Sequence, residues 1–170
     1  QGASTENYFH WLFDILPKIK ICFESYSLNK IDYFYLSDLT ISQMESLKYL
    51  GIKKKQILNS KIHNHISADK IIFISHPWYN KGKFHDQSYR LPKWIISWIR
   101  SYFLKYKKKI KSSKKIYLDR SESKYNHCQI INNKELKNYL IKKNFKSVKL
   151  SRLSFAKQIF MFWNAKCIIG

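Results

Sequence analysis

The sequence holds few of the residues on which several common scaffolds and sites depend. It has only 4 glycines in 170 residues and shows no glycine-rich loop of the kind that cradles a phosphate. Its 3 cysteines, Cys22, Cys128 and Cys167, lie far apart and form no C-x-x-C pair. They therefore indicate no disulfide framework, and we expect buried, unreactive thiols in a reducing cytosol.

Long apolar runs are missing as well. Stretches such as Ile71-Ile72-Phe73-Ile74 are far shorter than the roughly 20 residues that span a bilayer. No basic segment followed by an apolar one opens the sequence, so no signal peptide is visible. We expect a cytoplasmic location, with a peripheral contact to the anionic inner face of the cell membrane left open by the basic composition.

Acidic residues are scarce: 11 Asp and Glu stand against 32 Lys and Arg, which gives a net charge of +21. That charge is typical of nucleic-acid-binding proteins. However, 28 of the basic residues are lysines, and lysine lacks the bidentate fork with which arginine reads bases and phosphates. We therefore expect no specific nucleic-acid partner, although a basic nucleic-acid-binding module remains an alternative.

What is present can build a core, because 45% of the residues are hydrophobic and 16% are aromatic. In the first part of the chain, apolar spacing and turn residues predict helices over residues 5–25 (kinked or ended at Pro17), 42–50 (closed by Gly51) and 91–107. Strands are predicted over residues 31–36, 56–58 and 70–75. The last strand leads into a His76-Pro77-Trp78 loop, and Trp94 is expected on the buried face of the last helix.

A lysine-rich run, Lys107–Lys115, marks a domain boundary, so we divide the chain into residues 1–107 and 108–170. After the run, strands and helices alternate over residues 115–118, 133–143, 146–150, 155–164 and 166–169. This β-α-β-α-β order is one half of a doubly wound parallel sheet, an α/β fold. Residues 108–170 carry a net charge of +13 against +8 for residues 1–107, which favours the second part for an anionic ligand.

His10 and Asp14 are four residues apart on a predicted helix and therefore share one face. A carboxylate beside an imidazole fixes its tautomer and raises its basicity, as a general base requires. A purely structural polar pair is the alternative. His63 and His65 have no nearby third ligand, and no Asp-x-Asp pair occurs, so we expect no metal site.

The segment around this pair, Asn7-Tyr8-Phe9-His10-Trp11-Leu12-Phe13-Asp14-Ile15-Leu16-Pro17-Lys18, resembles the opening motif of glycosyltransferase family 61, the capsular polysaccharide biosynthesis group. Later blocks resemble the family in the same order. They are Leu50-Gly51-Ile52, Ala68-Asp69-Lys70-Ile71-Ile72, Lys115-Ile116-Tyr117-Leu118-Asp119-Arg120-Ser121, Asn132 to Leu136, and Leu150 to Ala165 with Leu153-Ser154-Phe155 and Gln158.

The resemblance implies a GT-B-like fold, with the end of one Rossmann-like acceptor-side domain followed by the start of a second, nucleotide-sugar-binding domain. It implies inverting, metal-independent transfer from a nucleotide-sugar to a saccharide acceptor, without a cofactor. On this reading His10 is the general base and Asp14 orients it. Arg120 contacts the donor phosphates, with Ser154 and Gln158 as further donor-side residues. The alternative for Arg120 is a surface ion pair with Asp119 or Glu122.

The sequence also departs from the family pattern. His127-Cys128-Gln129 occupy the stretch where a second arginine is usual, and Lys157 stands where a glutamate is common. The family's His-Gly-Ala-Gly loop is expected just beyond Gly170, so the chain is expected to be an internal fragment that is inactive alone. A non-catalytic relic of such an enzyme stays open as an alternative.

Overall fold

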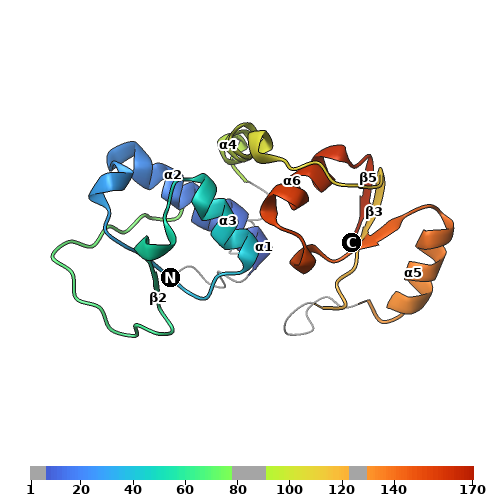
Figure 1. Ribbon diagram of the computed structural model, residues 1–170, viewed down its shortest axis with the longest axis horizontal. Coiled ribbons are helices and arrows are strands. Elements are labelled where there is room, and N and C mark those ends of the chain that lie inside the picture. The colour runs from blue at the N-terminus through green and yellow to red at the C-terminus, as the bar shows by residue number, and fades with distance from the viewer. Residues whose placement is uncertain (1–6, 78–90, 123–129) are drawn as a thin grey trace. The chain divides into compact units, whose positions relative to one another are not determined.

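A computed structural model describes residues 7–77, 91–122 and 130–170 (Figure 1). The chain forms two compact units, Gln1–Tyr102 and Phe103–Gly170. Both units combine helices with a small parallel sheet, so the predicted α/β class is confirmed. No helix in the described ranges is long and apolar enough to cross a membrane.

The first unit is built around a short β-α-β segment. Its described elements are α1 (Tyr8–His10), a π-helical turn (Trp11–Ile15), α2 (Leu16–Ser25), β1 (Phe34–Leu36), α3 (Ile41–Tyr49), β2 (Ile57–Asn59) and α4 (Lys93–Phe103). Strands β1 and β2 are parallel, with Tyr35 opposite Leu58. The two strands predicted over residues 31–36 and 56–58 are thus confirmed, the first of them shortened to its last three residues.

The helical stretch at the start of the chain changes type before Pro17. The amide of Leu16 donates to the carbonyl of Trp11, five residues earlier, which is the wide spacing of a π-helix. Proline has no N–H, and its ring collides with the carbonyl four residues back in a regular α-helix. A wider turn directly before Pro17 relieves this conflict, so the helix continues to Ser25. Residues 5 and 6 of the predicted helix lie outside the described residues.

Helix α3 ends before Gly51 as predicted and begins one residue before the predicted start. Thr40 accepts a hydrogen bond from the Gln43 amide, and the Gln43 side chain accepts one from the Thr40 amide, which closes a capping box. At the other end Gly51 adopts a φ of +88°, the left-handed conformation that a glycine allows after a helix.

Replacing Gly51 by alanine is expected to lower the free energy of unfolding by about 1–2 kcal/mol, because an L-residue is strained at this φ. A Cβ atom at this position would also lie 3.1 Å from Cδ2 of Leu28. Urea denaturation of both proteins measures the difference. An unchanged midpoint would contradict the assignment of Gly51 as the residue that ends the helix.

Two predictions for the first unit are wrong. Residues 70–75 form no strand in the structure, and Ile71 and Phe73 are 75% and 78% exposed. A run of β-branched and aromatic residues becomes a strand only where a neighbouring strand supplies hydrogen bonds. Trp94 is also exposed, since it lies one residue, and therefore about 100°, around the helix from the fully buried Ile95. The ammonium of Lys20 covers its ring at 5.6 Å.

The second unit confirms the predicted β-α-β-α-β alternation. Its elements are β3 (Lys115–Leu118), α5 (Asn133–Lys142), β4 (Lys146–Val148), α6 (Phe155–Asn164) and β5 (Cys167–Ile169). The three strands are parallel in the order β4-β3-β5, so the first strand of the unit is the central one. Figure 1 shows α5 and α6 on opposite sides of these strands, as right-handed crossovers to the two flanks of a central strand require.

The core of this unit lies between the sheet and its helices. Ile116 and Tyr117 of β3 are almost fully buried, and the buried apolar residues of the two helices are Leu140, Phe155, Ala156, Phe160 and Met161. The carboxyl ends of β3 and β5 approach closely, because a Cβ atom on Gly170 would lie 2.8 Å from that of Leu118. The strand order reverses at this point, which is where open α/β sheets bind ligands.

The two cysteines that the structure describes differ in exposure. Cys22 is buried as predicted, and burial raises the pKa of its thiol, which disfavours the reactive thiolate. Cys167 is exposed, which corrects the expectation of a buried thiol, because β5 has only β3 beside it among the described strands. Cys128, with its neighbours His127 and Gln129, lies outside the described residues, as does Trp78.

Candidate functional site

The first candidate site is the pair that the sequence singles out. Nδ1 of His10 lies 2.6 Å from Oδ2 of Asp14, within hydrogen-bonding distance. The Asp14 side chain is 10% exposed and that of His10 is 35% exposed. The carboxylate is therefore enclosed while the imidazole reaches solvent. This arrangement leaves Nε2 of His10 as the ring nitrogen that can exchange a proton with a bound molecule.

Trp11 fixes the turn that carries this pair. Its side chain is buried, and its indole N–H donates to the hydroxyl of Ser46 on α3 over 3.0 Å. Ser46 in turn donates to the carbonyl of Gln43. Because both groups are buried and hydrogen-bonded, the π-helical turn is held against α3 at a defined place. The hydrogen bond from Trp11 to Ser46 therefore also positions His10 and Asp14, which belong to the same helical stretch.

A second histidine, His76, joins the pair. Its Nε2 lies 3.3 Å from Oδ1 of Asp14, so the two oxygens of one carboxylate face two imidazoles. The sequence places His76 in a loop after a predicted strand but contains no signal that pairs it with Asp14. The two residues are far apart along the chain, and only the tertiary structure brings them together.

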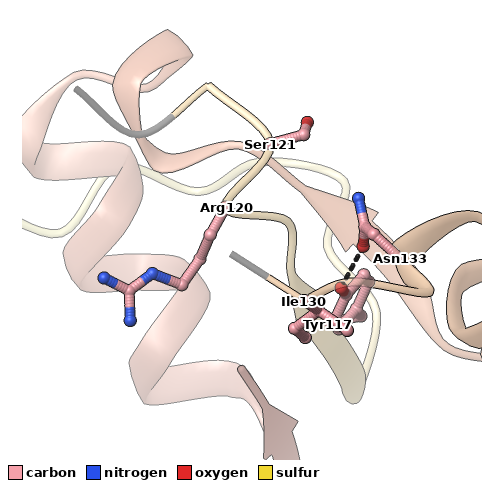
Figure 2. A pocket seen from close by; sticks show the side chains of 5 residues that line it. All are labelled: Tyr117, Arg120, Ser121, Ile130 and Asn133. Carbon is pink, nitrogen blue, oxygen red and sulfur yellow. Dashed lines mark hydrogen bonds between the residues drawn. The ribbon is translucent and has the colours of Figure 1, made fainter. Parts of the chain in front are cut away.

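The second candidate site is the carboxyl edge of the sheet in the second unit. Arg120 follows β3 and Asp119, as predicted, and its side chain is exposed. It lines a pocket of about 130 Å³ together with Tyr117, Ser121, Ile130 and Asn133. Figure 2 shows the guanidinium directed away from the hydrogen bond between Tyr117 and Asn133. The pocket is small against the about 300–1,000 Å³ of a typical ligand site.

Arg120 has no ion pair with another described residue, and the carboxylates expected as its alternative partners are bound elsewhere. Asp119 is buried and accepts hydrogen bonds from the Lys137 ammonium (3.0 Å) and the Ser121 amide (3.0 Å). Burial alone raises the pKa of the Asp119 carboxyl, but the Ser121 and Lys137 interactions outweigh it and hold that pKa well below its usual value. Glu122 contacts Lys149 and Arg152. Arg120 is therefore available to an anion.

Ser154 and Gln158, the other residues predicted on the donor side, lie at the start of α6. Ser154 is the N-cap residue, but its side chain makes no capping hydrogen bond. Gln158 is buried, and its amide nitrogen donates to the carbonyls of Leu150 and Leu153, each over 3.0 Å. Those bonds hold the turn before α6 in place. Contact of either residue with a donor stays a prediction.

Among the described residues, no three or more His, Cys, Asp or Glu side chains gather as ligands for one metal ion. His63 and His65 are exposed; the His63 carbonyl accepts a hydrogen bond of 2.7 Å from the Tyr35 hydroxyl, and the His63 amide donates one of 2.9 Å to the Asn59 carbonyl.

Comparison with known proteins gives one match. The model of the family described as Glycosyltransferase 61 matches residues 8–170. In the other two comparisons, no curated protein and no solved structure matches the chain. The family match includes both candidate sites, His10 with Asp14 in the first unit and Arg120 in the second.

Proposed function

Since the chain belongs to glycosyltransferase family 61, we propose that it transfers a sugar from a nucleotide-sugar donor to a hydroxyl of a saccharide acceptor. The transfer inverts the anomeric centre and needs no metal ion or cofactor, and it contributes to capsular or other surface polysaccharide. The observation that carries this proposal is the contact of 2.6 Å between the half-exposed His10 and the enclosed Asp14.

In this mechanism His10 is the general base. Its Nε2 takes the proton of the acceptor hydroxyl, whose oxygen forms a bond to the anomeric carbon. The bond from that carbon to the phosphate oxygen breaks, and the nucleoside diphosphate leaves with the electron pair. Because the acceptor attacks the face opposite the leaving group, the configuration inverts. The Asp14 carboxylate accepts a hydrogen bond from the Nδ1–H group of His10, which keeps Nε2 as the basic nitrogen.

His76 stabilises the orientation of Asp14 in this proposal. With one imidazole on each carboxylate oxygen, the side chain cannot rotate without losing a contact. A fixed carboxylate holds the ring of His10 in one orientation, and proton transfer depends on that orientation. His76 is thus a positioning residue and not a second base.

Arg120 supplies the donor-side charge. A guanidinium binds phosphate oxygens in a bidentate manner and stabilises the charge that develops on a leaving diphosphate. Its place directly after β3, at the edge where strand order reverses, supports this role. We accordingly assign residues 108–170 to a donor domain and residues 1–107 to an acceptor-side domain of a GT-B-like enzyme. We place the reaction in the cytoplasm, at the inner face of the membrane.

Replacing Arg120 by alanine is expected to weaken the binding of a nucleoside diphosphate by about 10- to 100-fold, the usual effect of losing charged hydrogen bonds. Arg120→Lys should recover only part of the affinity, because an ammonium cannot bind in a bidentate manner. Calorimetric titration with uridine and guanosine diphosphates measures both. The matched control is Arg100→Ala, which removes an exposed arginine from α4. Equal losses in the two alanine variants would contradict the assignment.

The activity itself is tested by incubating the intact enzyme with a panel of nucleotide-sugars, with and without a chelator. Release of nucleoside diphosphate that depends on an added saccharide, and that survives the chelator, is the expected result. Binding of a nucleotide-sugar without turnover at saturating acceptor would favour a non-catalytic relic of the family.

A further inference from the structure

Glu122 lies between two cations of the second unit. One of its carboxylate oxygens is 2.7 Å from Nζ of Lys149 and also contacts Nη2 of Arg152. The other oxygen accepts a hydrogen bond of 3.3 Å from Nε of Arg152. The guanidinium therefore binds the carboxylate with two of its nitrogens, which is also the geometry with which it binds a phosphate group.

All three residues lie at the carboxyl edge of the sheet. Glu122 follows β3, whereas Lys149 follows β4 directly and Arg152 ends the helical turn that precedes α6. Because β3 and β4 are parallel, their ends meet at one edge, and Arg120 stands at that edge too. The cluster therefore lies at the same edge as Arg120, which the proposed function assigns to the donor phosphates. Its own cations, Lys149 and Arg152, have no role in that proposal so far.

Lys149 and Arg152 also line a groove of about 640 Å³, large enough for a nucleotide. Its other charged residues are the cations Lys111, Lys137 and Lys146 and the anion Asp119. The charge of Asp119 is matched by the Lys137 ammonium. The groove is therefore basic, and Glu122 forms ion pairs with two of its cations, Lys149 and Arg152.

Acidic side chains are rare in residues 108–170, so the position of Glu122 between two cations stands out. Residues 108–170 contain only three acidic side chains, Asp119, Glu122 and Glu135, against sixteen basic ones. One of the three, Glu122, contacts two cations at the carboxyl edge of the sheet, although its side chain is exposed to solvent. The interaction with Arg152 and then with Lys149 lowers the pKa of Glu122, so the carboxylate is charged at neutral pH.

We infer that Lys149 and Arg152 form a second phosphate-binding site and that the Glu122 carboxylate occupies it as an internal competitor when no donor is bound. This inference rests on the proposed function, which supplies the diphosphate of a nucleotide-sugar as the anion. When the donor binds, its phosphate oxygens replace the carboxylate oxygens on the two cations, and Glu122 turns to solvent. The carboxylate thereby weakens the binding of any diphosphate and keeps the site from holding stray anions.

The test uses inorganic pyrophosphate and uridine diphosphate as probes of the intact enzyme at low ionic strength. Glu122→Gln is expected to tighten the binding of both by about threefold to fivefold, the size of an exposed ion-pair effect, and the gain should shrink at high salt. Glu135→Gln is the matched control, because it removes the same charge from the exposed start of α5. Arg152→Gln should weaken binding, and adding it to Glu122→Gln should abolish the gain.

Equal affinities in Glu122→Gln and Glu135→Gln would overturn the inference, as would a gain that persists in the Glu122→Gln, Arg152→Gln double variant. The pyrophosphate titration contains neither sugar nor acceptor, so its result is separate from the activity. A gain for pyrophosphate in an enzyme that binds no nucleotide-sugar would leave the anion site standing and remove the proposed function. If the enzyme turns over a nucleotide-sugar but Glu122→Gln and Glu135→Gln bind pyrophosphate equally well, the proposed function stands and the inference about Glu122 fails.

Discussion

Replacing His10 by alanine is expected to lower the turnover number of the intact enzyme by about 10²–10⁴-fold, because a general base contributes about that factor to a rate. The Michaelis constants for donor and acceptor should change little, since the proton moves chiefly in the transition state. Steady-state kinetics at saturating donor, with a melting curve of each protein, give the measurement. The loss follows from the geometry: His10 is half-exposed, and its Nδ1 is held by Asp14.

Two further variants separate a base from a structural histidine. Asp14→Asn should lose less activity than His10→Ala, because it disturbs the tautomer and basicity of the imidazole without removing it. His76→Gln should lose less again, since His76 acts on His10 indirectly, through the second oxygen of Asp14. If His10→Ala keeps normal turnover, or loses activity only in step with a large fall in melting temperature, His10 is part of the scaffold.

Replacing Asp119 by alanine is expected to lower the free energy of unfolding by about 2–3 kcal/mol. Loss of one partner of a buried ion pair costs about 3–5 kcal/mol, and the value is smaller here because the Lys137 side chain is 37% exposed and reaches water. The Asp119 side chain itself is 1% exposed, and its removal also leaves the Ser121 amide without its acceptor. Urea denaturation at neutral pH measures the loss.

The same residue makes stability depend on pH. The folded protein holds the pKa of Asp119 below its value in the unfolded chain, which is near ~3.9. In the acidic range the unfolded chain therefore binds the proton first, so the contribution of Asp119 is present above that value and is lost as the pH falls below it. The difference in stability between wild type and Asp119→Ala should therefore shrink as the pH falls from about 6 toward about 2.

Glu135→Gln is the control for both measurements, because it removes an exposed carboxylate of the same unit and should cost less than about 1 kcal/mol. Two results would contradict the role of Asp119 as a charged anchor. One is an Asp119→Ala variant as stable as wild type at neutral pH, and the other is a difference in the free energy of unfolding that grows as the pH falls. In that case a residue other than Asp119 would hold the segment that carries Arg120 in place.

Much of the local structure follows from local pattern. The alternation of elements in residues 115–169, the capped end of α3 at Gly51 and the helix of residues 155–164 are all confirmed. Each depends on the backbone preferences and apolar spacing of a short stretch, which the sequence states directly. The contact of His10 with Asp14 also follows from spacing, since residues four apart on a helix are neighbours.

Contacts between residues that are distant along the chain could not be predicted from local sequence pattern. His76 meets Asp14, and Glu122 meets Lys149 and Arg152, through the path of the chain around the sheets, and no short pattern encodes that path. For the same reason residues 70–75 look like a strand by composition but pair with none, because pairing depends on a second strand being alongside.

Local pattern in the sequence predicts most of the helices and strands, the end of α3 at Gly51 and the shared helix face of His10 and Asp14. It also carried the resemblance to glycosyltransferase family 61 that the family match confirms. Which charged groups from distant parts of the chain meet depends on the tertiary structure. The carboxylates of Asp119 and Glu122 each take partners from other elements, and Arg120 is thereby left without a partner among the described residues. The physical reason is range: backbone preferences act over a few residues, whereas hydrogen bonds and ion pairs form wherever folding brings two groups within about 3–4 Å.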